Sequence, residues 1–244
     1  MSALRFRKNP MKQKLWLATS LLVFAALAVG SAQEKDKRLH SGGPKGWGVQ
    51  KAEIKDPKLP RVLLIGDSIL NGYRATVAKA LEGKANVDAW VNPLHQASSG
   101  LHEQLKGVLA EGPYAVVHFN MGLHGWPKGR IPDGQFTPLT RKLVHTIRDN
   151  APRAALIWAS STPVTVKGEP TMLDPEINAT IVEHNRMAAA VMKEENVPVN
   201  DLYTLMVSRL DLARGDQFHW KGEGSVLQGK AVAEIVAKHL VAKK

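Results

Sequence analysis

From residue 61 onward, short apolar runs alternate with longer segments of helical periodicity. A continuous apolar run is typical of a strand buried on both faces, and its alternation with amphipathic helices predicts a parallel sheet covered on both sides. Strands are expected near 62–66, 87–91, 114–119, 154–160 and 197–201, and helices near 69–82, 100–111, 137–150, 175–196 and 224–241. The sequence therefore predicts an α/β fold, a three-layer α/β/α sandwich with a five-stranded parallel sheet. Right-handed crossovers give it the flavodoxin-like order 2-1-3-4-5 in one domain.

The fourth predicted helix, 175–196, has the clearest boundary. Asp174 is the expected N-cap and Pro175 suits the first turn. Its apolar stripe contains Ile177, Ile181, His184, Ala188 and Val191. On such a stripe, we expect His184 to be a packing histidine and not a catalyst.

A serine follows the first apolar run directly, in Gly66-Asp67-Ser68. This position places a hydroxyl at the carboxyl end of a central strand, where open α/β sheets bind ligands. A serine hydroxyl needs an imidazole to take its proton, and the imidazole needs an acid to orient it. His219 and Asp216, spaced Asp-x-x-His just before the last helical segment, suit these roles. Alone, a serine before a helix is often an N-cap, and an Asp and a His near a helix start often only cap it.

Two further positions suit an oxyanion hole, the set of donors that stabilises negative charge on an ester oxygen. Gly100 opens the helix after the second strand, so its backbone N–H can face a ligand with no Cβ in the way. Asn120 ends the third strand and offers a side-chain amide at the same sheet edge. Alone, each is an ordinary turn residue. Their order, each at a strand-to-helix junction, favours a serine hydrolase site.

With these motifs the chain resembles the SGNH hydrolases, also called the GDSL esterase/lipase family, from about residue 61 to 240. The resemblance implies that Ser68 is the nucleophile and that His219 is the general base, oriented by Asp216. It also implies an oxyanion hole made of the Ser68 N–H, the Gly100 N–H and the Asn120 amide. No metal or organic cofactor is implied. The members most similar in character are bacterial extracellular carbohydrate acetylesterases.

The chain departs from the family pattern at its third block. The family usually has Gly-x-Asn-Asp there, whereas this chain has His118-Phe119-Asn120-Met121. The change affects the loop geometry and keeps the amide donor. Ile69 replaces the usual leucine after the nucleophile, which is a conservative change.

The N-terminus has the features of a signal peptide over residues 1–32. Five basic residues precede the uncharged, mostly apolar run 15–29, and Gly30-Ser31-Ala32 supplies small residues for cleavage before Gln33. The alternative is a retained membrane anchor, for which the run is shorter than the roughly 18 to 20 residues that span a bilayer comfortably. We therefore expect an exported protein, periplasmic or secreted, with no stable membrane span after cleavage. The absence of cysteine suits either compartment and excludes disulfides, thiol catalysis and thiolate metal sites.

The net charge of +11 is concentrated near the N-terminus. Five basic residues lie in the leader and an excess of four lies in 33–61, so only +2 remains for 62–244. A near-neutral catalytic domain, 61–244, argues against a nucleic-acid-binding surface. The Gly- and Pro-rich stretch 33–60 is interpreted as a flexible basic arm or linker, either a tether or a wrapping arm. Its lysines could attract an anionic glycan or membrane surface, although simple solvation explains them as well.

The substrate is expected to contact loops, above all 121–138. There His124 and Trp126 are candidate substrate-binding residues; alternatively the loop packs its aromatic side chains inward. Trp220, beside His219, is either a pocket wall or core.

We expect an exported serine esterase that removes small acyl groups, most simply acetyl, from an acylated carbohydrate. The alternatives are a thioesterase or short-chain lysophospholipase with the same residues, or a non-catalytic glycan-binding protein. The sequence leaves the glycan and the oligomeric state open.

Overall fold

The computed structural model describes residues 47–241. The predicted signal peptide, 1–32, and the first part of the predicted arm, 33–46, lie outside the described residues. Among the described helices, none has the length and apolar character needed to cross a membrane.

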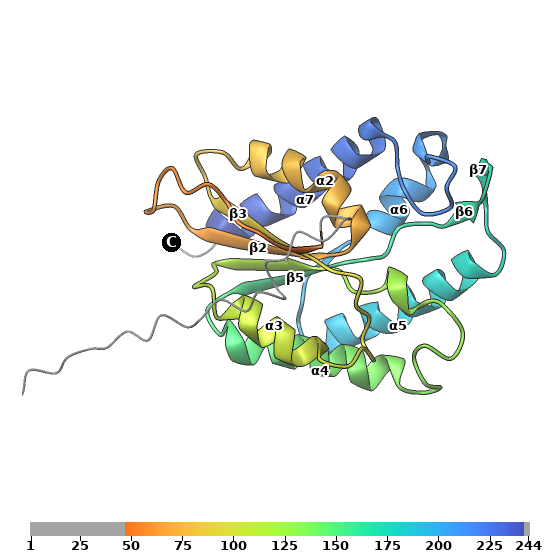
Figure 1. Ribbon diagram of the computed structural model, residues 1–244, viewed down its shortest axis with the longest axis horizontal. Helices are drawn as coiled ribbons and strands as arrows, with labels where there is room; N and C mark the ends of the chain where they lie inside the picture. The colour runs from red at the N-terminus through yellow and green to blue at the C-terminus, as the bar shows by residue number, and fades with distance from the viewer. Residues whose placement is uncertain (1–46, 242–244) are drawn as a thin grey trace, which may run out of the picture. The chain divides into compact units, whose positions relative to one another are not determined.

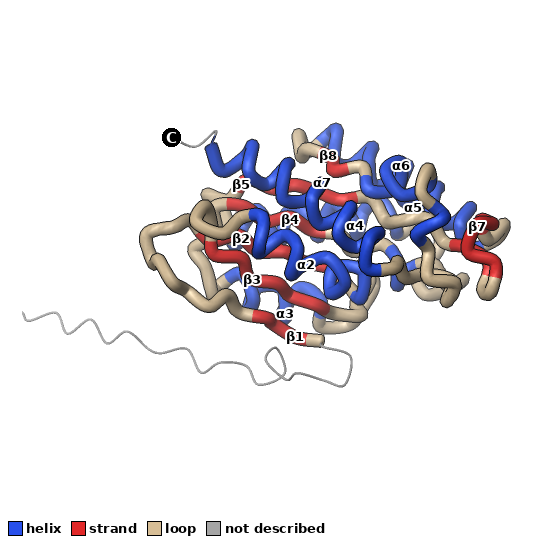
Figure 2. Tube along the Cα trace, turned by 90° about the horizontal axis from the view of Figure 1, so that it is seen from above, coloured by secondary structure: helices blue, strands red, loops and turns tan. Residues whose placement is uncertain are grey.

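A six-stranded sheet forms the centre of the fold, in the order β1-β3-β2-β4-β5-β8 (Figure 2). Its strands are β1 (Gly48–Gln50), β2 (Arg61–Gly66), β3 (Asn86–Val91), β4 (Val116–Phe119), β5 (Ala155–Ala159) and β8 (Val199–Asn200). The five predicted strands are parallel and follow the predicted order 2-1-3-4-5. The predicted count of five was wrong because β1 adds an antiparallel edge strand beside β3. Three residues with no apolar run carry no strand signal, and they lay in the stretch interpreted as an arm or linker.

Helices cover both faces of the sheet (Figure 1). The helices are α2 (Ser68–Ala80), α3 (Leu101–Leu109), α4 (Phe136–Asn150), α5 (Ile177–Glu194), α6 (Leu202–Val207) and α7 (Gly222–Val241). Helices α2, α6 and α7 lie on one face, and α3, α4 and α5 lie on the other. The three-layer α/β/α sandwich is therefore confirmed. Helix α6 was not expected, because six residues are too short to show a helical period.

Alternate residues of β2 pack into two separate hydrophobic clusters, which accounts for its continuous apolar run. Leu63 and Ile65 belong to the cluster shared with α3, α4 and α5. Val62 and Leu64 belong to the cluster shared with α2, α6 and α7. All four side chains are at most 1% exposed. The central strand that leads to Ser68 is thus fixed from both sides.

Helices α2 and α7 approach each other closely at Gly229 of α7. A Cβ added there would lie 2.6 Å from the Thr76 Cβ of α2. Only glycine allows this approach, so a larger side chain would push the helices apart. The contact matters for the site because α2 begins at Ser68 and α7 follows the loop that carries His219.

A small hairpin that the sequence did not predict lies outside the main sheet. It consists of β6 (Thr165–Val166) and β7 (Glu169–Leu173), paired antiparallel. Its strands are short and its second strand is largely exposed, so neither shows an apolar pattern. In Figure 1 the hairpin lies beside the loop that leads into α7.

Helix α5 begins two residues later than predicted, at Ile177. The predicted cap residue still acts at this end, because the Asp174 carboxylate accepts hydrogen bonds from the N–H groups of Glu176 (3.1 Å) and Ile177 (2.8 Å). His184 stacks on the Phe136 ring with centroids 4.1 Å apart, as expected for a packing histidine.

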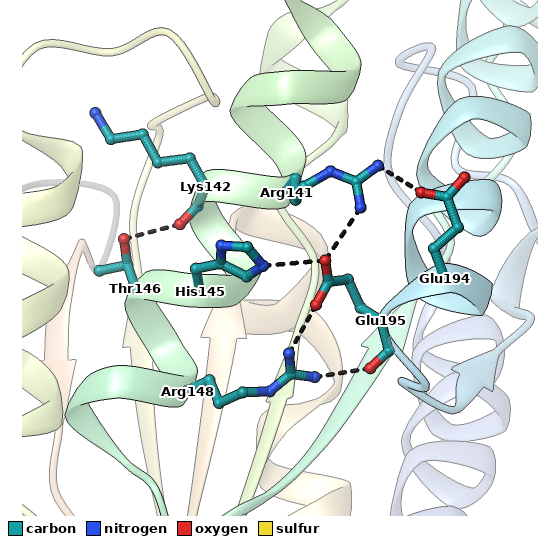
Figure 3. Close-up of polar contacts among 7 residues, drawn as sticks. All are labelled: Arg141, Lys142, His145, Thr146, Arg148, Glu194 and Glu195. Carbon is teal, nitrogen blue, oxygen red and sulfur yellow. Dashed lines mark hydrogen bonds and ion pairs between the residues drawn. The ribbon is translucent and has the colours of Figure 1, made fainter.

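An ion-pair network centred on Glu195 joins α4 to the end of α5 (Figure 3). The Glu195 carboxylate accepts hydrogen bonds from Arg148 (2.7 Å) and Arg141 (3.1 Å), and His145 Nε2 lies 3.0 Å from it. Arg148 also donates to the Glu195 carbonyl oxygen at 2.7 Å. These contacts, the Arg148 bond foremost, lower the pKa of Glu195 to about 2.

We expect Glu195→Gln to lower the free energy of unfolding by about 1 kcal/mol at pH 7, a typical contribution for partly screened ion pairs. Because the pKa is lowered in the folded state, this stabilisation is present above the unfolded value of about 4.3 and is lost as the pH falls toward 2. Urea unfolding at neutral and acidic pH measures both effects. Glu183→Gln, which removes only the pair with Arg186 within the same helix, is the control. Equal losses in the two variants would contradict a role in joining the helices.

Candidate active site

Ser68 is the first residue of α2 and follows β2 by one residue. The intervening Asp67 is buried, and its carboxylate accepts a hydrogen bond from the Ile69 N–H at 2.9 Å. The first N–H groups of a helix have no partner within the helix and carry its positive dipole end. The Ser68 N–H is therefore placed where it can bind an anionic oxygen.

The imidazole of His219 bridges a serine and an aspartate. Its Nε2 lies 2.9 Å from Ser68 Oγ, and its Nδ1 lies 2.9 Å from Asp216 Oδ2. These distances are those of hydrogen bonds, so the three side chains form the Ser-His-Asp arrangement predicted from the sequence. The His219 and Asp216 side chains are 34% and 33% exposed, so the site opens to solvent.

The turn from Asp216 to His219 is organised around the Asp216 carboxylate. Its Oδ1 accepts from the N–H groups of Phe218 (3.3 Å) and His219 (2.8 Å). Arg214 donates to Oδ2 from Nε at 3.0 Å and from a terminal nitrogen at 2.6 Å. Partial burial raises the pKa of Asp216, but the hydrogen bonds from His219 and Arg214 outweigh it and hold this pKa at about 2. The carboxylate therefore stays ionised at neutral pH and can fix the His219 ring.

A second His–Asp pair flanks the nucleophile. His124 Nε2 lies 4.0 Å from Asp67 Oδ2. Burial raises the pKa of Asp67, and the hydrogen bond from the Ile69 N–H and the nearby imidazoles of His124 and His219 oppose this rise. The structure thus places the predicted substrate-binding residue His124 next to the segment that carries Ser68.

The two other predicted oxyanion donors are Gly100, at the end of the loop after β3, and Asn120, directly after β4. Gly100 precedes α3 with φ +74°, a backbone conformation that glycine adopts without strain. The Asn120 N–H donates to the Ile65 carbonyl at 2.9 Å, which aligns the end of β4 with the end of β2. The Asn120 side-chain amide donates to the Ala159 carbonyl (2.6 Å) and to Ser161 Oγ (3.3 Å). To bind an ester oxygen, Asn120 would have to exchange the longer of these bonds, so its oxyanion role stays a prediction.

A cavity of about 500 Å³ opens beside Ser68 and His219. It is lined by Trp47, Ser68, Leu123, His124, Trp126, Pro127, Arg130, Phe218 and His219. Trp126 stacks with Phe218 at 6.4 Å between centroids, and Trp47 meets His124 edge-on at 6.1 Å. The candidates His124 and Trp126 are therefore both at the cavity. Trp47 was missed because the arm shows no periodicity, whereas Phe218 lies inside the Asp-x-x-His motif and could have been found there.

Trp220 belongs mainly to the hydrophobic core and only in part to a pocket wall. Its side chain is 6% exposed and packs with Met206 and Leu212. Its Nε1 donates to Thr162 Oγ1 at 3.3 Å. It does not line the large cavity, but it borders a smaller cleft of about 250 Å³ on which Ser68 also lies.

Within residues 47–241, no group of three or more His, Cys, Asp or Glu side chains is placed to hold a metal ion. No family model matches the sequence, and no curated protein matches it.

Solved structures of hydrolases do match the fold. A lipase/acylhydrolase from Enterococcus faecalis is 21% identical, with a TM-score of 0.61 over 74% of this chain and 96% of its own. A carbohydrate esterase family 3 structure from Talaromyces cellulolyticus is 15% identical, with a TM-score of 0.63 over 76% of this chain and 100% of its own. A carbohydrate acetylesterase from Sinorhizobium meliloti is 15% identical, with a TM-score of 0.60 over 73% of this chain and 99% of its own. The chain has the fold of these hydrolases. Structures at these levels of identity show the fold alone. At that level they confirm the resemblance to the SGNH hydrolases.

The geometry predicts that Ser68 reacts with diisopropyl fluorophosphate. Its Oγ should displace fluoride while His219 takes the hydroxyl proton. Mass spectrometry of the digested protein should find the phosphoryl group on the peptide that contains Ser68.

Ser225→Ala is the matched control, since Ser225 borders the smaller cleft together with Ser68. It should label at the rate of the unaltered protein, whereas Ser68→Ala should not label. Labelling that survives Ser68→Ala would contradict the assignment.

Proposed function

We propose that the protein is a serine esterase that removes small acyl groups, acetyl above all, from carbohydrates. The observation that carries this proposal is the His219 ring, which lies 2.9 Å from both Ser68 Oγ and Asp216 Oδ2. An alcohol, a base and an ionised acid in this arrangement are the requirements for acyl transfer through a covalent intermediate.

In the first half of the proposed reaction, Ser68 Oγ attacks the carbonyl carbon of the ester and His219 Nε2 takes the hydroxyl proton. The negative charge that develops on the carbonyl oxygen is stabilised by donors at the sheet edge: the Ser68 N–H, the Gly100 N–H and the Asn120 amide. The tetrahedral intermediate then collapses. The bond to the sugar oxygen breaks, and His219 returns its proton to that oxygen.

In the second half, water attacks the acyl group on Ser68. His219 accepts a proton from the water, and the same donors stabilise the second tetrahedral intermediate. The bond to Ser68 Oγ breaks, the proton returns to Oγ, and the carboxylic acid leaves. Asp216 stays ionised throughout and stabilises the protonated ring.

The aromatic cavity supports a carbohydrate as the leaving group. Trp126 and Phe218 form one wall, and Trp47 and His124 form another. The flat, partly apolar face of a pyranose ring suits such walls, and its hydroxyl groups remain available to polar neighbours and water. Two of the structural neighbours are a carbohydrate esterase and a carbohydrate acetylesterase, which supports this substrate class.

The signal-peptide pattern at residues 1–32 supports export to the periplasm or the medium, where polymeric carbohydrates occur. We propose a mature chain that begins near Gln33, with an uncleaved membrane anchor as the alternative.

A panel of substrates tests the function. The mature protein should release acetate from acetylated oligosaccharides and hydrolyse p-nitrophenyl acetate, and Ser68→Ala should abolish both activities. Trp126→Ala should raise KM for the oligosaccharide about tenfold, the effect of losing about 1.4 kcal/mol of binding, and leave p-nitrophenyl acetate hydrolysis unchanged. Lys128→Ala, an exposed neighbour on the same loop, is the control.

Two results would reject the proposal. Faster turnover of acyl thioesters or lysolipids would favour a thioesterase or lysophospholipase. Binding of oligosaccharides without any Ser68-dependent hydrolysis would favour a glycan-binding protein.

Asn120→Ala should lower kcat about 100-fold to 1,000-fold with little change in KM, the usual cost of removing one oxyanion donor. Steady-state kinetics on p-nitrophenyl acetate measures both constants. Ser161→Ala removes the weaker acceptor of the Asn120 amide and should leave kcat nearly unchanged, because the catalytic donor remains. If Asn120→Ala retained the original kcat, Asn120 would have only a structural role, through its bond to Ala159.

A further inference from the structure

The turn between Asp216 and His219 contains a residue in a strained backbone conformation. Gln217 has φ +90°, and within residues 47–241 the only other non-glycine residue with positive φ is Asn196, at 53°. Asparagine tolerates this region, whereas a longer side chain such as glutamine does so at a cost. Strain of this kind persists only where surrounding contacts impose it.

The backbone contacts that hold this turn come from the hairpin of β6 and β7. The Thr165 N–H donates to the Gln217 carbonyl at 3.0 Å, and the Gly168 N–H donates to the Gly215 carbonyl at 3.0 Å. The two bonds lie on either side of Asp216 in the sequence. The hairpin therefore fixes the peptide groups that flank the triad acid.

The Gln217 side chain makes a third contact outside the triad. Its Nε2 donates to Asp174 Oδ2 at 3.3 Å. Asp174 is itself fixed, because its other carboxylate oxygen accepts from the Ile177 N–H at the start of α5 and its own N–H donates to the Val164 carbonyl at 2.9 Å. This contact links the catalytic turn to α5.

The stem of the loop is closed below the turn. Ala213 and Trp220 form an antiparallel bridge, and the Arg214 N–H donates to the His219 carbonyl at 2.9 Å. With the stem closed and the tip held by the hairpin, the backbone between them has little freedom to relax.

We propose that the β6–β7 hairpin and Asp174 form a positioning brace for the triad. The brace holds Gln217 in its strained conformation, and that conformation turns the Asp216 carboxylate toward His219 Nδ1. The hydrogen bonds of Gln217 go to Asp174 and Thr165, whereas the ring nitrogens of His219 pair with Asp216 and Ser68. Gln217 is therefore a positioning residue and not a catalytic one. The inference rests on the proposed esterase function for its kinetic consequences, but its geometric claim can be measured without turnover.

Gln217→Gly tests the brace most directly. Glycine adopts positive φ without strain and can reach conformations that a side chain forbids, so the turn gains freedom even though its stem stays closed. Glycine also lacks the bond to Asp174. We expect kcat on p-nitrophenyl acetate and the rate of fluorophosphate labelling to fall together by about tenfold, since small misplacements of catalytic groups are costly. KM should change less than about twofold, because the cavity is intact. The melting temperature should stay level or rise as strain is released, which a merely structural residue would not show.

Asn196→Gly is the matched control, because it relieves the other positive φ. Asn196 lies just beyond the end of α5, whereas Asp174, the partner of Gln217, lies just before its start. The 18 residues of α5 separate the two ends by about 27 Å. This control should keep the original kcat. Gln217→Asn is the second variant: asparagine tolerates positive φ but is too short to keep the bond to Asp174, so it should also lose activity while folding normally.

Proton NMR separates this inference from the proposed function. The His219 Nδ1 proton, shared with Asp216, should give a low-field signal that is absent in His219→Gln and is shifted or lost in Gln217→Gly. If the signal and the labelling rate of Gln217→Gly equal those of the original protein, or if Asn196→Gly loses as much activity, the brace is wrong. If the original protein hydrolyses no ester but shows the signal, and Gln217→Gly loses it, the brace is supported and the esterase function is rejected.

Discussion

The hydrogen bond between His219 Nε2 and Ser68 Oγ joins residues that are 151 positions apart, and the proposed chemistry depends on it. The fold places both ends of this bond. Strand β2, buried on both faces, directs Ser68 to the sheet edge, and the close contact at Gly229 holds α7 against α2. A shift of about 1 Å between these helices would cost much of the rate, because acyl transfer requires near-contact geometry.

Charge is arranged in an order that favours acyl transfer. Asp216 is ionised and lies on one side of the His219 ring, and the hydroxyl of Ser68 lies on the other. The positive end of the α2 dipole lies at the Ser68 N–H, where the ester oxygen would become negative. Hydrogen bonds from His219 and, to a smaller extent, from Arg214 keep the acid charged. The oxyanion site is less fully formed than the Ser-His-Asp arrangement, because the Asn120 amide donates to Ala159 and Ser161.

The parts of the molecule that could be predicted from the sequence are those with a local signal. The buried strands have continuous apolar runs, and the triad residues stand at strand or helix ends in a recognisable order. Strand β1, helix α6 and the β6–β7 hairpin were missed because each is too short for a period to appear. The conformation of Gln217 could not be predicted, since distant contacts from Thr165 and Asp174 impose it. Trp47 joins the cavity for the same reason: tertiary packing, and not local pattern, places it there.

The most direct test of the proposed active site is a crystal structure of the protein after reaction with diethyl p-nitrophenyl phosphate, whose adduct mimics the tetrahedral intermediate. A diethyl phosphoryl group is expected on Ser68 Oγ. Its free oxygen should accept hydrogen bonds from the Ser68 and Gly100 N–H groups and from the Asn120 amide, with His219 still bound to Asp216. An adduct on a different residue, or a Ser68 adduct whose oxygen faces away from all three donors, would contradict it.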